Sequence, residues 1–233
     1  MNSPQSEINL RERDKQAAAR AAVELIEPGS IVGLGSGSTA TWVIRFLAER
    51  VRDGLKIIGI PTSQKTQQLA EQLRIPLSTL DENPQIDIDI DGADEIDPQL
   101  NLIKGGGGAL LREKIIASAS RRFVVVADSA KQVTRLGKFP LPVEVIPFAQ
   151  SLLASRIAGL GAQVSLRRYA YGKPYLTDEG HHILDCNFGE IADPAVLSGK
   201  LRAIPGVVEH GLFVGMAELA LVGKDGEVIR IRR

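Results

Sequence analysis

Helical and strand-like segments alternate along the first part of this chain, and this alternation constrains the fold more than any other feature of the sequence. Short apolar runs typical of buried strands occupy residues 30–34, 55–60, 86–90 and 123–127. Helical patterns lie around them, in the segment that carries Trp42 and Phe46 and at residues 10–27, 63–73 and 108–118. Strands that alternate with helices are joined by right-handed crossovers and form a mostly parallel sheet. The sequence therefore predicts an α/β fold, in which ligands bind at the carboxyl ends of the strands.

A different order of elements begins after Lys138. Strands are predicted at residues 142–147, 162–168, 181–186 and 207–212, and helices at 148–158 and 193–203. This βαββαβ order is the ferredoxin-like split motif. The tail is predicted to form a hairpin that rejoins the first domain. We therefore expect one domain formed by residues 1–137 and 213–233, with an inserted α+β domain at 138–212.

Composition and charge argue against several classes of partner. The chain has 28 Lys and Arg residues and 28 Asp and Glu residues, so it lacks the basic balance typical of proteins that bind nucleic acids or anionic membranes. Its single cysteine, Cys186, rules out an internal disulfide and fits a reducing compartment. The polar N-terminus lacks the apolar core of a signal peptide, and no segment reaches the roughly 20 apolar residues of a membrane span. We expect a cytoplasmic protein with no nucleic-acid or membrane partner.

A glycine-rich loop, GLGSGST at residues 33–39, joins the first predicted strand to a helix. Glycines let backbone N–H groups turn toward an anion, and a helix N-terminus adds a favourable dipole. The hydroxyl groups of Ser36, Ser38 and Thr39 are further donors. The dinucleotide-binding fingerprint would need glycine in place of Ser38, and the P-loop would need a Gly-Lys-Ser/Thr sequence that is absent here. We interpret the loop as a phosphate cradle for a small substrate, with a merely tight turn as the alternative.

Acidic residues alternate with isoleucine in the segment DIDIDG. The pattern resembles the start of a calcium loop, but proline stands where that loop requires Glu, and the isoleucines favour a strand, so calcium binding is rejected. We interpret Asp87 and Asp89 as the polar face of a half-exposed strand. Asp91, Asp94 and Glu95 lie past the strand end, where ligands bind. Clustered carboxylates there favour acid–base chemistry, because their mutual repulsion tends to raise one pKa.

Lys104 precedes a run of four glycines, Gly105–Gly108. Such a run costs conformational entropy, so it favours a backbone that passes close to a ligand over a plain connector. The lysine could place its cation on an oxyanion. Glu113 falls in the early turns of the helix that follows, and two interpretations of it stay open: an acid–base group, or a solvated helix carboxylate.

Four motifs, in this order and spacing, closely resemble those of type A ribose-5-phosphate isomerases: GLGSGSTA, DGADEID, KGGGGALLREK and VVVADSAK. The likeness continues through PLPVEVIPFA, YLTDEGHHILDC and IPGVVEHGLF, so it covers nearly the whole chain. The resemblance implies a Rossmann-like catalytic domain with an inserted ferredoxin-like lid, a sugar-phosphate substrate of the pentose phosphate pathway, no metal, no cofactor, and a homodimer or homotetramer. One departure is Gly108, where the family often has alanine, and we expect only local loosening from it.

The resemblance also implies roles for individual residues. Glu113 would be the general base that interconverts D-ribose 5-phosphate and D-ribulose 5-phosphate, and Lys104 with the adjacent glycine amides would hold the enediolate. Asp91 and Asp94 would assist ring opening and proton transfer at the hydroxyls. One carboxylate can move a proton between C2 and C1 if an oxyanion site stabilises the intermediate. The other implied substrate-binding residues are Ser36, Gly37, Ser38, Thr39, Gly92, Ala93, Gly105, Gly106, Gly107, Lys131 and Lys15, and phosphate is the expected target of the last two.

Two other classes of function are alternatives to the isomerase. A sugar-phosphate-sensing transcription regulator would need a DNA-binding module, and residues 1–29, ahead of the first predicted strand, read as one helix, too short for a helix-turn-helix unit. An amino-sugar-phosphate deaminase or a CoA transferase of related fold is the third option. A deaminase would be expected to use a catalytic histidine, yet His181, His182 and His210 lie outside the motif loops and lack metal-ligand spacing. Cys186 has no evident base partner and is expected in the core.

Overall fold

The computed structural model describes residues 4–233, which form two compact units. Unit 1 holds the described residues up to Ala93 together with Arg112–Gln132 and Met216–Arg233, and unit 2 holds Asp94–Leu111 and Val133–Gly215. Residues 1–3, which the expected first domain includes, lie outside the described residues.

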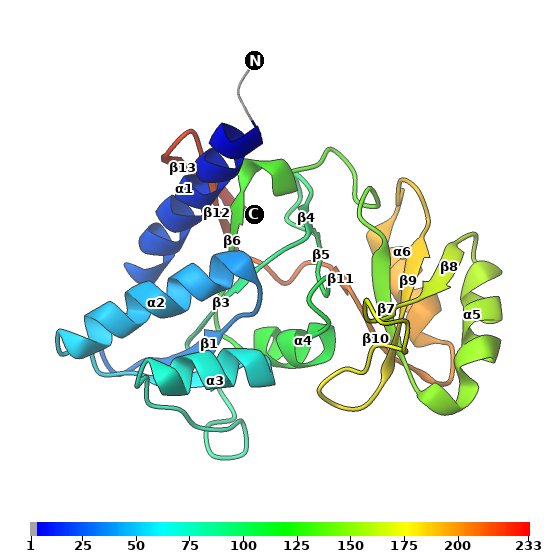
Figure 1. Ribbon diagram of the computed structural model, residues 1–233, viewed down its shortest axis with the longest axis horizontal. Coiled ribbons are helices and arrows are strands. Elements are labelled where there is room, and N and C mark those ends of the chain that lie inside the picture. The colour runs from blue at the N-terminus through cyan, green and yellow to red at the C-terminus, as the bar shows by residue number, and fades with distance from the viewer. Residues whose placement is uncertain (1–3) are drawn as a thin grey trace. The chain divides into compact units, whose positions relative to one another are not determined.

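Unit 1 is built on a six-stranded, mostly parallel sheet with the strand order β13-β12-β6-β3-β1-β2 (Figure 1). All neighbours are parallel except β12 and β13, the hairpin of the tail. Parallel strands covered by helices on both faces are buried on both sides, which explains their continuous apolar runs. The predicted α/β, Rossmann-like class is confirmed. The strands are β1 (Ile31–Leu34), β2 (Ile58–Pro61), β3 (Ile88–Gly92), β6 (Phe123–Asp128), β12 (Leu219–Lys224) and β13 (Glu227–Arg232).

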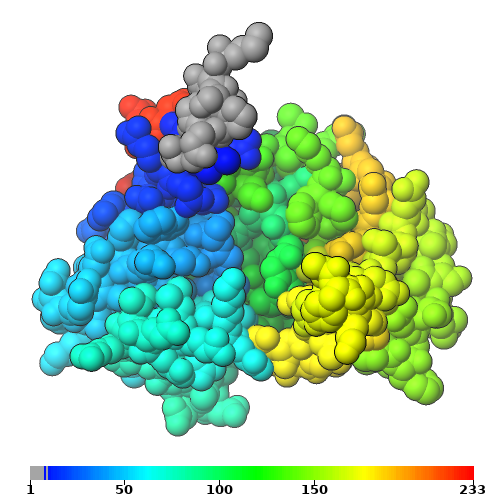
Figure 2. Space-filling model, in the orientation of Figure 1, coloured from blue at the N-terminus to red at the C-terminus, as the bar shows by residue number. Residues whose placement is uncertain are grey.

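Helices cover both faces of this sheet. The helices α1 (Pro4–Val23) and α2 (Ser38–Arg52) pack together over β3, β6 and β12, and they share a core with Val32, Leu34 and other strand residues. The helix α3 (Gln64–Gln72) contacts α2 and β2, and Figure 2 shows α2 and α3 side by side on the surface. On the opposite face, Ile116 of α4 (Leu110–Ala119) packs against Ile60 and Ile86.

Strand β3 is not the half-exposed strand that the alternating aspartates suggested. It lies between β1 and β6, and the side chain of Asp89 is completely buried. A Cβ atom at position 33 would lie 2.6 Å from Asp89 Oδ1, so Gly33 leaves room for this carboxylate. The interpretation is therefore wrong for Asp89. Asp87, just before the strand, is partly exposed, accepts a hydrogen bond from the backbone N–H of Ile31 and forms an ion pair with Arg121.

Unit 2 contains a four-stranded antiparallel sheet with the order β10-β7-β9-β8. With its two helices the chain order is β7-α5-β8-β9-α6-β10, as the split motif predicts. Apolar residues of the strands and helices form a separate core, which contains Cys186, and burial raises the pKa of this thiol to about 12. The elements are β7 (Leu141–Val145), α5 (Gln150–Ala158), β8 (Gln163–Leu166), β9 (His182–Asn187), α6 (Pro194–Arg202) and β10 (Val207–His210). The described residues also contain two short 3₁₀ helices: η1 (Ser129–Lys131) in unit 1 and η2 (Pro147–Ala149) in unit 2.

A small three-stranded sheet in unit 2 was not predicted. It has the order β11-β5-β4 and consists of β4 (Glu95–Ile96), β5 (Leu102–Ile103) and β11 (Leu212–Phe213). The carboxylate of Glu95 accepts hydrogen bonds from the backbone N–H groups of Gly137 and Phe139, 2.7 and 2.6 Å away. These contacts join residues 94–111 to unit 2, so the bounds differ from the expected division at 138 and 212. Glu95 thus has a structural role in unit 2.

Candidate active site

The carboxyl end of β3 meets the glycine-rich loop that follows β1. The side chain of Asp91 is completely buried, and its Oδ1 accepts hydrogen bonds from the backbone N–H groups of Ser36 (2.9 Å) and Gly92 (2.6 Å). A Cβ atom at position 35 would lie 2.3 Å from the same oxygen, so only glycine at Gly35 allows this close approach. Three of the predicted substrate-binding positions, Ser36, Asp91 and Gly92, are therefore brought together in unit 1.

A cluster of hydroxyl groups holds the side chain of Ser36. Its Oγ lies 2.8 Å from Thr62 Oγ1, 2.7 Å from Ser63 Oγ and 3.1 Å from Thr66 Oγ1. Thr66 also donates to the carbonyl of Gly35, and Ser63 caps the N-terminus of α3. The sequence reasoning missed this cluster. The available signal was the Thr62-Ser63 pair at the carboxyl end of β2, next to β1 in the sheet.

The predicted helix after the glycine-rich segment is α2, and it begins at Ser38, within that segment. Its N-terminal turn has no side-chain cap, and Gly37 precedes it with φ of 96°, a value that favours glycine. Ser38 is exposed and Thr39 is 8% exposed. Backbone N–H groups at an uncapped helix start, together with hydroxyl donors, form an arrangement suited to a phosphate group.

The two lysines expected near phosphate occupy different elements of unit 1. Lys15 lies on α1 and forms an ion pair with Glu12 at 2.7 Å. Glu12 also accepts a hydrogen bond from Trp42 Nε1 on α2, and the hydrogen bond from Lys15, followed by that from Trp42, lowers the pKa of this carboxyl. Lys131 ends η1, which follows β6, and β6 is the neighbour of β3 in the parallel sheet. The carboxyl ends of β1, β3 and β6 therefore carry the loop, Asp91 and Lys131 at one edge of the sheet.

Glu113 is not a solvated helix carboxylate. It lies in the first turn of α4 and is only 4% exposed. A carboxylate in such a position costs free energy of folding unless other groups compensate for its lost hydration, so burial favours the acid–base interpretation. Lys114, the next residue along the helix, is also buried, at 5% exposure.

Lys104 is one of the largest fully buried side chains among the described residues and lies in unit 2, directly after β5. Its Nζ is 5.5 Å from the centroid of the Phe213 ring, within the range of a cation–π interaction. The glycine run that follows turns sharply, since Gly105 has φ of 94° and the Gly108 N–H donates to the Gly105 carbonyl. The N–H of Gly106 donates to Asp94 Oδ2 at 2.7 Å.

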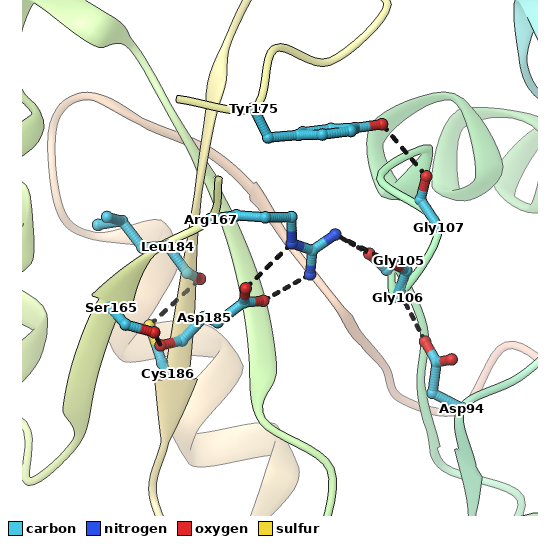
Figure 3. A network of polar contacts seen from close by, with 10 residues as sticks. All are labelled: Asp94, Gly105, Gly106, Gly107, Ser165, Arg167, Tyr175, Leu184, Asp185 and Cys186. Carbon is cyan, nitrogen blue, oxygen red and sulfur yellow. Dashed lines mark hydrogen bonds and ion pairs between the residues drawn. The ribbon is translucent and has the colours of Figure 1, made fainter. Parts of the chain in front are cut away.

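Arg167 and Tyr175 bind the carbonyl groups of the same glycine run (Figure 3). Arg167 Nη1 donates to the carbonyl oxygens of Gly105 at 2.9 Å and Gly106 at 3.1 Å, and Tyr175 Oη donates to that of Gly107 at 3.3 Å. The sequence reasoning missed both residues, because nothing local in the sequence links them to the glycines.

Within residues 4–233, no group of three or more His, Cys, Asp or Glu side chains is arranged to hold a metal ion. No helix in that range combines the length and the apolar character that crossing a membrane requires.

A Rossmann-like sheet with buried carboxylates at its strand ends, accompanied by an antiparallel α+β unit, defines an α/β enzyme. Residues 58–227 match the family model described as ribose 5-phosphate isomerase A (phosphoriboisomerase A). The chain is 53% identical to ribose-5-phosphate isomerase A of Parvibaculum lavamentivorans, over 91% of this chain and 94% of the relative. It is 55% identical to that of Roseiflexus sp. strain RS-1, over 92% and 94%.

Solved structures agree with these relatives. Ribose 5-phosphate isomerase A of Methanocaldococcus jannaschii superposes with a TM-score of 0.90 at 42% identity and covers 94% of this chain and 98% of its own. A D-ribose-5-phosphate isomerase in complex with phospho-erythronic acid gives a TM-score of 0.93 at 40% identity, over 96% and 99%. The chain belongs to the ribose 5-phosphate isomerase A family, a family of isomerases. This membership favours the isomerase over the regulator, deaminase and transferase alternatives.

Proposed function

We propose that this protein interconverts D-ribose 5-phosphate and D-ribulose 5-phosphate through an enediolate, with Glu113 as the general base. The family supports the overall reaction. The observation that carries the assignment of the base is the burial of Glu113, at 4% exposure, on the helix that follows the lysine–glycine run. A buried carboxylate has the means to take a proton from carbon because water does not compete for its charge.

The proposed reaction moves two protons, one between the carbons and one between the oxygens, and leaves the number of electrons in the sugar unchanged. In the open-chain aldose, the Glu113 carboxylate takes the proton from C2, and the electron pair of that C–H bond forms the C1–C2 double bond of the enediolate. The resulting carboxylic acid of Glu113 then returns the proton to C1 while the C2 oxygen becomes a carbonyl. The two oxygens exchange one proton during these steps, so the net change is the transfer of the carbonyl from C1 to C2.

Lys104 and the carboxylates of Asp91 and Asp94 complete the proposed chemistry. Lys104, with the glycine run of Gly105, Gly106 and Gly107, would stabilise the negative charge that develops on the enediolate oxygen. Its burial supports this role, because a cation interacts more strongly with an oxyanion where water is excluded. Asp91 and Asp94 would assist opening of the furanose ring and proton transfer at the hydroxyls.

The phosphate group of the substrate is assigned to the N-terminus of α2 and to the side chains of two lysines. Backbone and hydroxyl donors of residues 36–39 would bind its oxygens, with Lys131 and Lys15 supplying positive charge. Gly92 and Ala93 would contact the sugar at the end of β3. Binding energy from the remote phosphate would orient the reacting carbons, which lowers the barrier of the chemical step.

The proposal needs neither a metal nor a cofactor, since Lys104 can act as the electrophile. It places the protein in the cytoplasm and in the non-oxidative pentose phosphate pathway, as a homodimer or homotetramer.

The proposed reaction is tested by incubating the purified protein with D-ribose 5-phosphate and measuring ribulose 5-phosphate, with and without EDTA. We expect the same turnover in both, because the assigned charge stabilisation comes from a lysine. Absence of any conversion would refute the substrate assignment. Loss of turnover in EDTA that a divalent cation restores would refute the metal-free mechanism while leaving the substrate assignment in place.

A further inference from the structure

We propose that Arg167 is a positioning residue for the glycine run Gly105–Gly107, and that its guanidinium sets the direction of two consecutive peptide groups beside Lys104. The inference rests on the proposed function, since it concerns the same reaction. It adds a residue that does not contact the reacting atoms and acts through the backbone.

The guanidinium of Arg167 donates hydrogen bonds to a carboxylate on one side and to carbonyl groups of the glycine run on the other (Figure 3). Its Nε donates to Asp185 Oδ2 at 3.0 Å and its Nη2 donates to Asp185 Oδ1, a bidentate pair. Asp185 lies within β9, where the backbone is paired to both neighbouring strands. The remaining nitrogen, Nη1, donates to the carbonyls of Gly105 and Gly106. The strand β9 therefore holds Asp185 in place, Asp185 orients the guanidinium of Arg167, and the guanidinium restrains the glycine run.

Each carbonyl contact determines where the next N–H points. A trans peptide group is planar, so its N–H points opposite to its C=O, and the described residues contain no cis peptide bond. The peptide joining Gly105 to Gly106 is bound at both ends: its carbonyl accepts from Arg167, and its N–H donates to Asp94. Arg167 thus also fixes the partner of the Asp94 carboxylate. The next peptide has its carbonyl on Arg167, so the N–H of Gly107 points away from the guanidinium.

Glycine peptides need such external support because they have no side chains to restrict them. Glycine loses more conformational freedom on folding than any other residue, and Gly106 and Gly107 are exposed. The side chains of Arg167 and Asp185 are only 14% and 24% exposed, so their pairing is partly shielded from water. Tyr175 adds a second support, since its backbone N–H donates to the Arg167 carbonyl and its hydroxyl donates to Gly107.

The test compares Arg167→Lys with Arg168→Lys, measuring kcat and KM for ribose 5-phosphate together with amide hydrogen exchange of residues 104–111. Lysine keeps the charge but lacks the planar fork that binds Asp185 and two carbonyls at once. We expect Arg167→Lys to lower kcat by about 10- to 100-fold, with a smaller change in KM, as displacement of catalytic groups by about 1 Å does. Exchange should become faster at residues 104–111 and stay unchanged in β7 and β9.

Arg168→Lys is the matched control, because Arg168 is the next residue, and its guanidinium donates to Gly172 of its own loop. It should retain the wild-type kcat and exchange pattern. Two milder variants test the inference even if Arg167→Lys does not fold. Asp185→Asn weakens the hydrogen bonds that orient the guanidinium, and Tyr175→Phe removes only the hydrogen bond to Gly107. Both should accelerate exchange of residues 104–111 and lower kcat, by less than Arg167→Lys.

The outcomes separate this inference from the proposed function. If the wild-type protein converts ribose 5-phosphate and the Arg167 and Asp185 variants turn over at the wild-type rate, the inference is overturned and the proposed function stands. A fall in kcat accompanied by faster exchange throughout unit 2 also overturns it, because that result shows general destabilisation. If the wild type is inactive, the proposed function fails and Arg167 loses its catalytic significance, whatever the exchange shows.

Discussion

At the scale of single residues, the proposed proton transfer depends on the burial of Glu113. Helix periodicity did not decide which side of the helix this glutamate occupies. The structure buries it, at 4% exposure, in the first turn of α4. A buried carboxylate is costly, so its presence at the first turn of a helix favours a function that requires it. Negative charge is also tolerated best at this end of a helix.

Replacement of Glu113 by glutamine should leave the fold intact and remove proton transfer. Glutamine has nearly the same shape but cannot accept the C2 proton, so we expect kcat to fall by about 10²- to 10⁴-fold, the usual contribution of a positioned acid–base group. The thermal unfolding temperature should stay close to that of the wild type. Glu49→Gln, at an exposed position of α2, is the matched control and should retain full turnover. Near-normal activity of Glu113→Gln would contradict the assignment.

Most helices and strands could be predicted from the sequence, because buried elements require apolar residues at regular positions. The strands β1, β2 and β6 lie inside a sheet or under helices, and each is read directly from a short apolar run. The small sheet of β4, β5 and β11 was not predicted, because its strands have two residues each, too few to show an alternation of apolar and polar residues. The exposure of β3 was predicted wrongly for another reason: its aspartates alternate as on an exposed face, and the glycines that make room for them lie on β1 and in the loop that follows it.

The glycine run shows how an element can depend on a distant side chain. Gly108 was expected only to loosen the chain locally. The structure instead fills the space beside it, since a Cβ atom at position 108 would lie 2.3 Å from Tyr175 Oη, and φ there is +86°. We expect Gly108→Ala to destabilise the protein by about 1–3 kcal/mol in chemical unfolding, because a side chain is strained at positive φ and must also displace the tyrosine.

A double-mutant comparison separates these two causes. In a Tyr175→Ser background the steric conflict is gone, so Gly108→Ala should cost less there than in the wild type, leaving the cost of the positive φ alone. Equal losses in both backgrounds would show that Tyr175 does not occupy the position in solution.

At the scale of the whole molecule, the residues proposed for the chemistry belong to both units, Asp91 and Glu113 to unit 1 and Asp94 and Lys104 to unit 2. Local motifs located all four in the sequence. The groups that hold them were not predictable in this way, since Arg167 and Gly105 are 62 residues apart in the chain. Recognition of such partners requires the tertiary fold, because a hydrogen bond between a side chain and a distant carbonyl imposes no periodicity on either segment.

Stability of the whole chain should depend on pH through Glu144, a buried residue of β7 that lies outside the proposed chemistry. It is 1% exposed, and its Oε1 accepts hydrogen bonds from Thr177 Oγ1 at 2.9 Å and from His181 Nδ1 at 3.0 Å. Among the described residues its Oε2 has no hydrogen-bond partner. Burial raises the pKa of Glu144 above its ordinary value of 4.5, against the lowering effect of the two hydrogen bonds.

A raised pKa means that the folded protein binds the proton of Glu144 more tightly than the unfolded chain does. Its contribution to stability is fully present below the unfolded value of about 4.5 and is lost as the pH rises through the folded value. The Glu144→Gln variant is neutral at every pH and has no such loss. In a series of thermal melts, the unfolding temperature of Glu144→Gln minus that of the wild type should therefore increase from pH 4 toward neutral pH.

The control for this pH dependence is His181→Asn, which removes the imidazole that opposes the shift. Without the hydrogen bond from His181, the pKa of Glu144 should rise further, so the loss of stability should extend to higher pH than in the wild type. The double variant Glu144→Gln/His181→Asn should show the same dependence of the unfolding temperature on pH as Glu144→Gln, because the carboxyl that titrates is gone. A difference in unfolding temperature that stays constant with pH would show that Glu144 titrates alike in the folded and unfolded chains, and that its burial is relieved in solution.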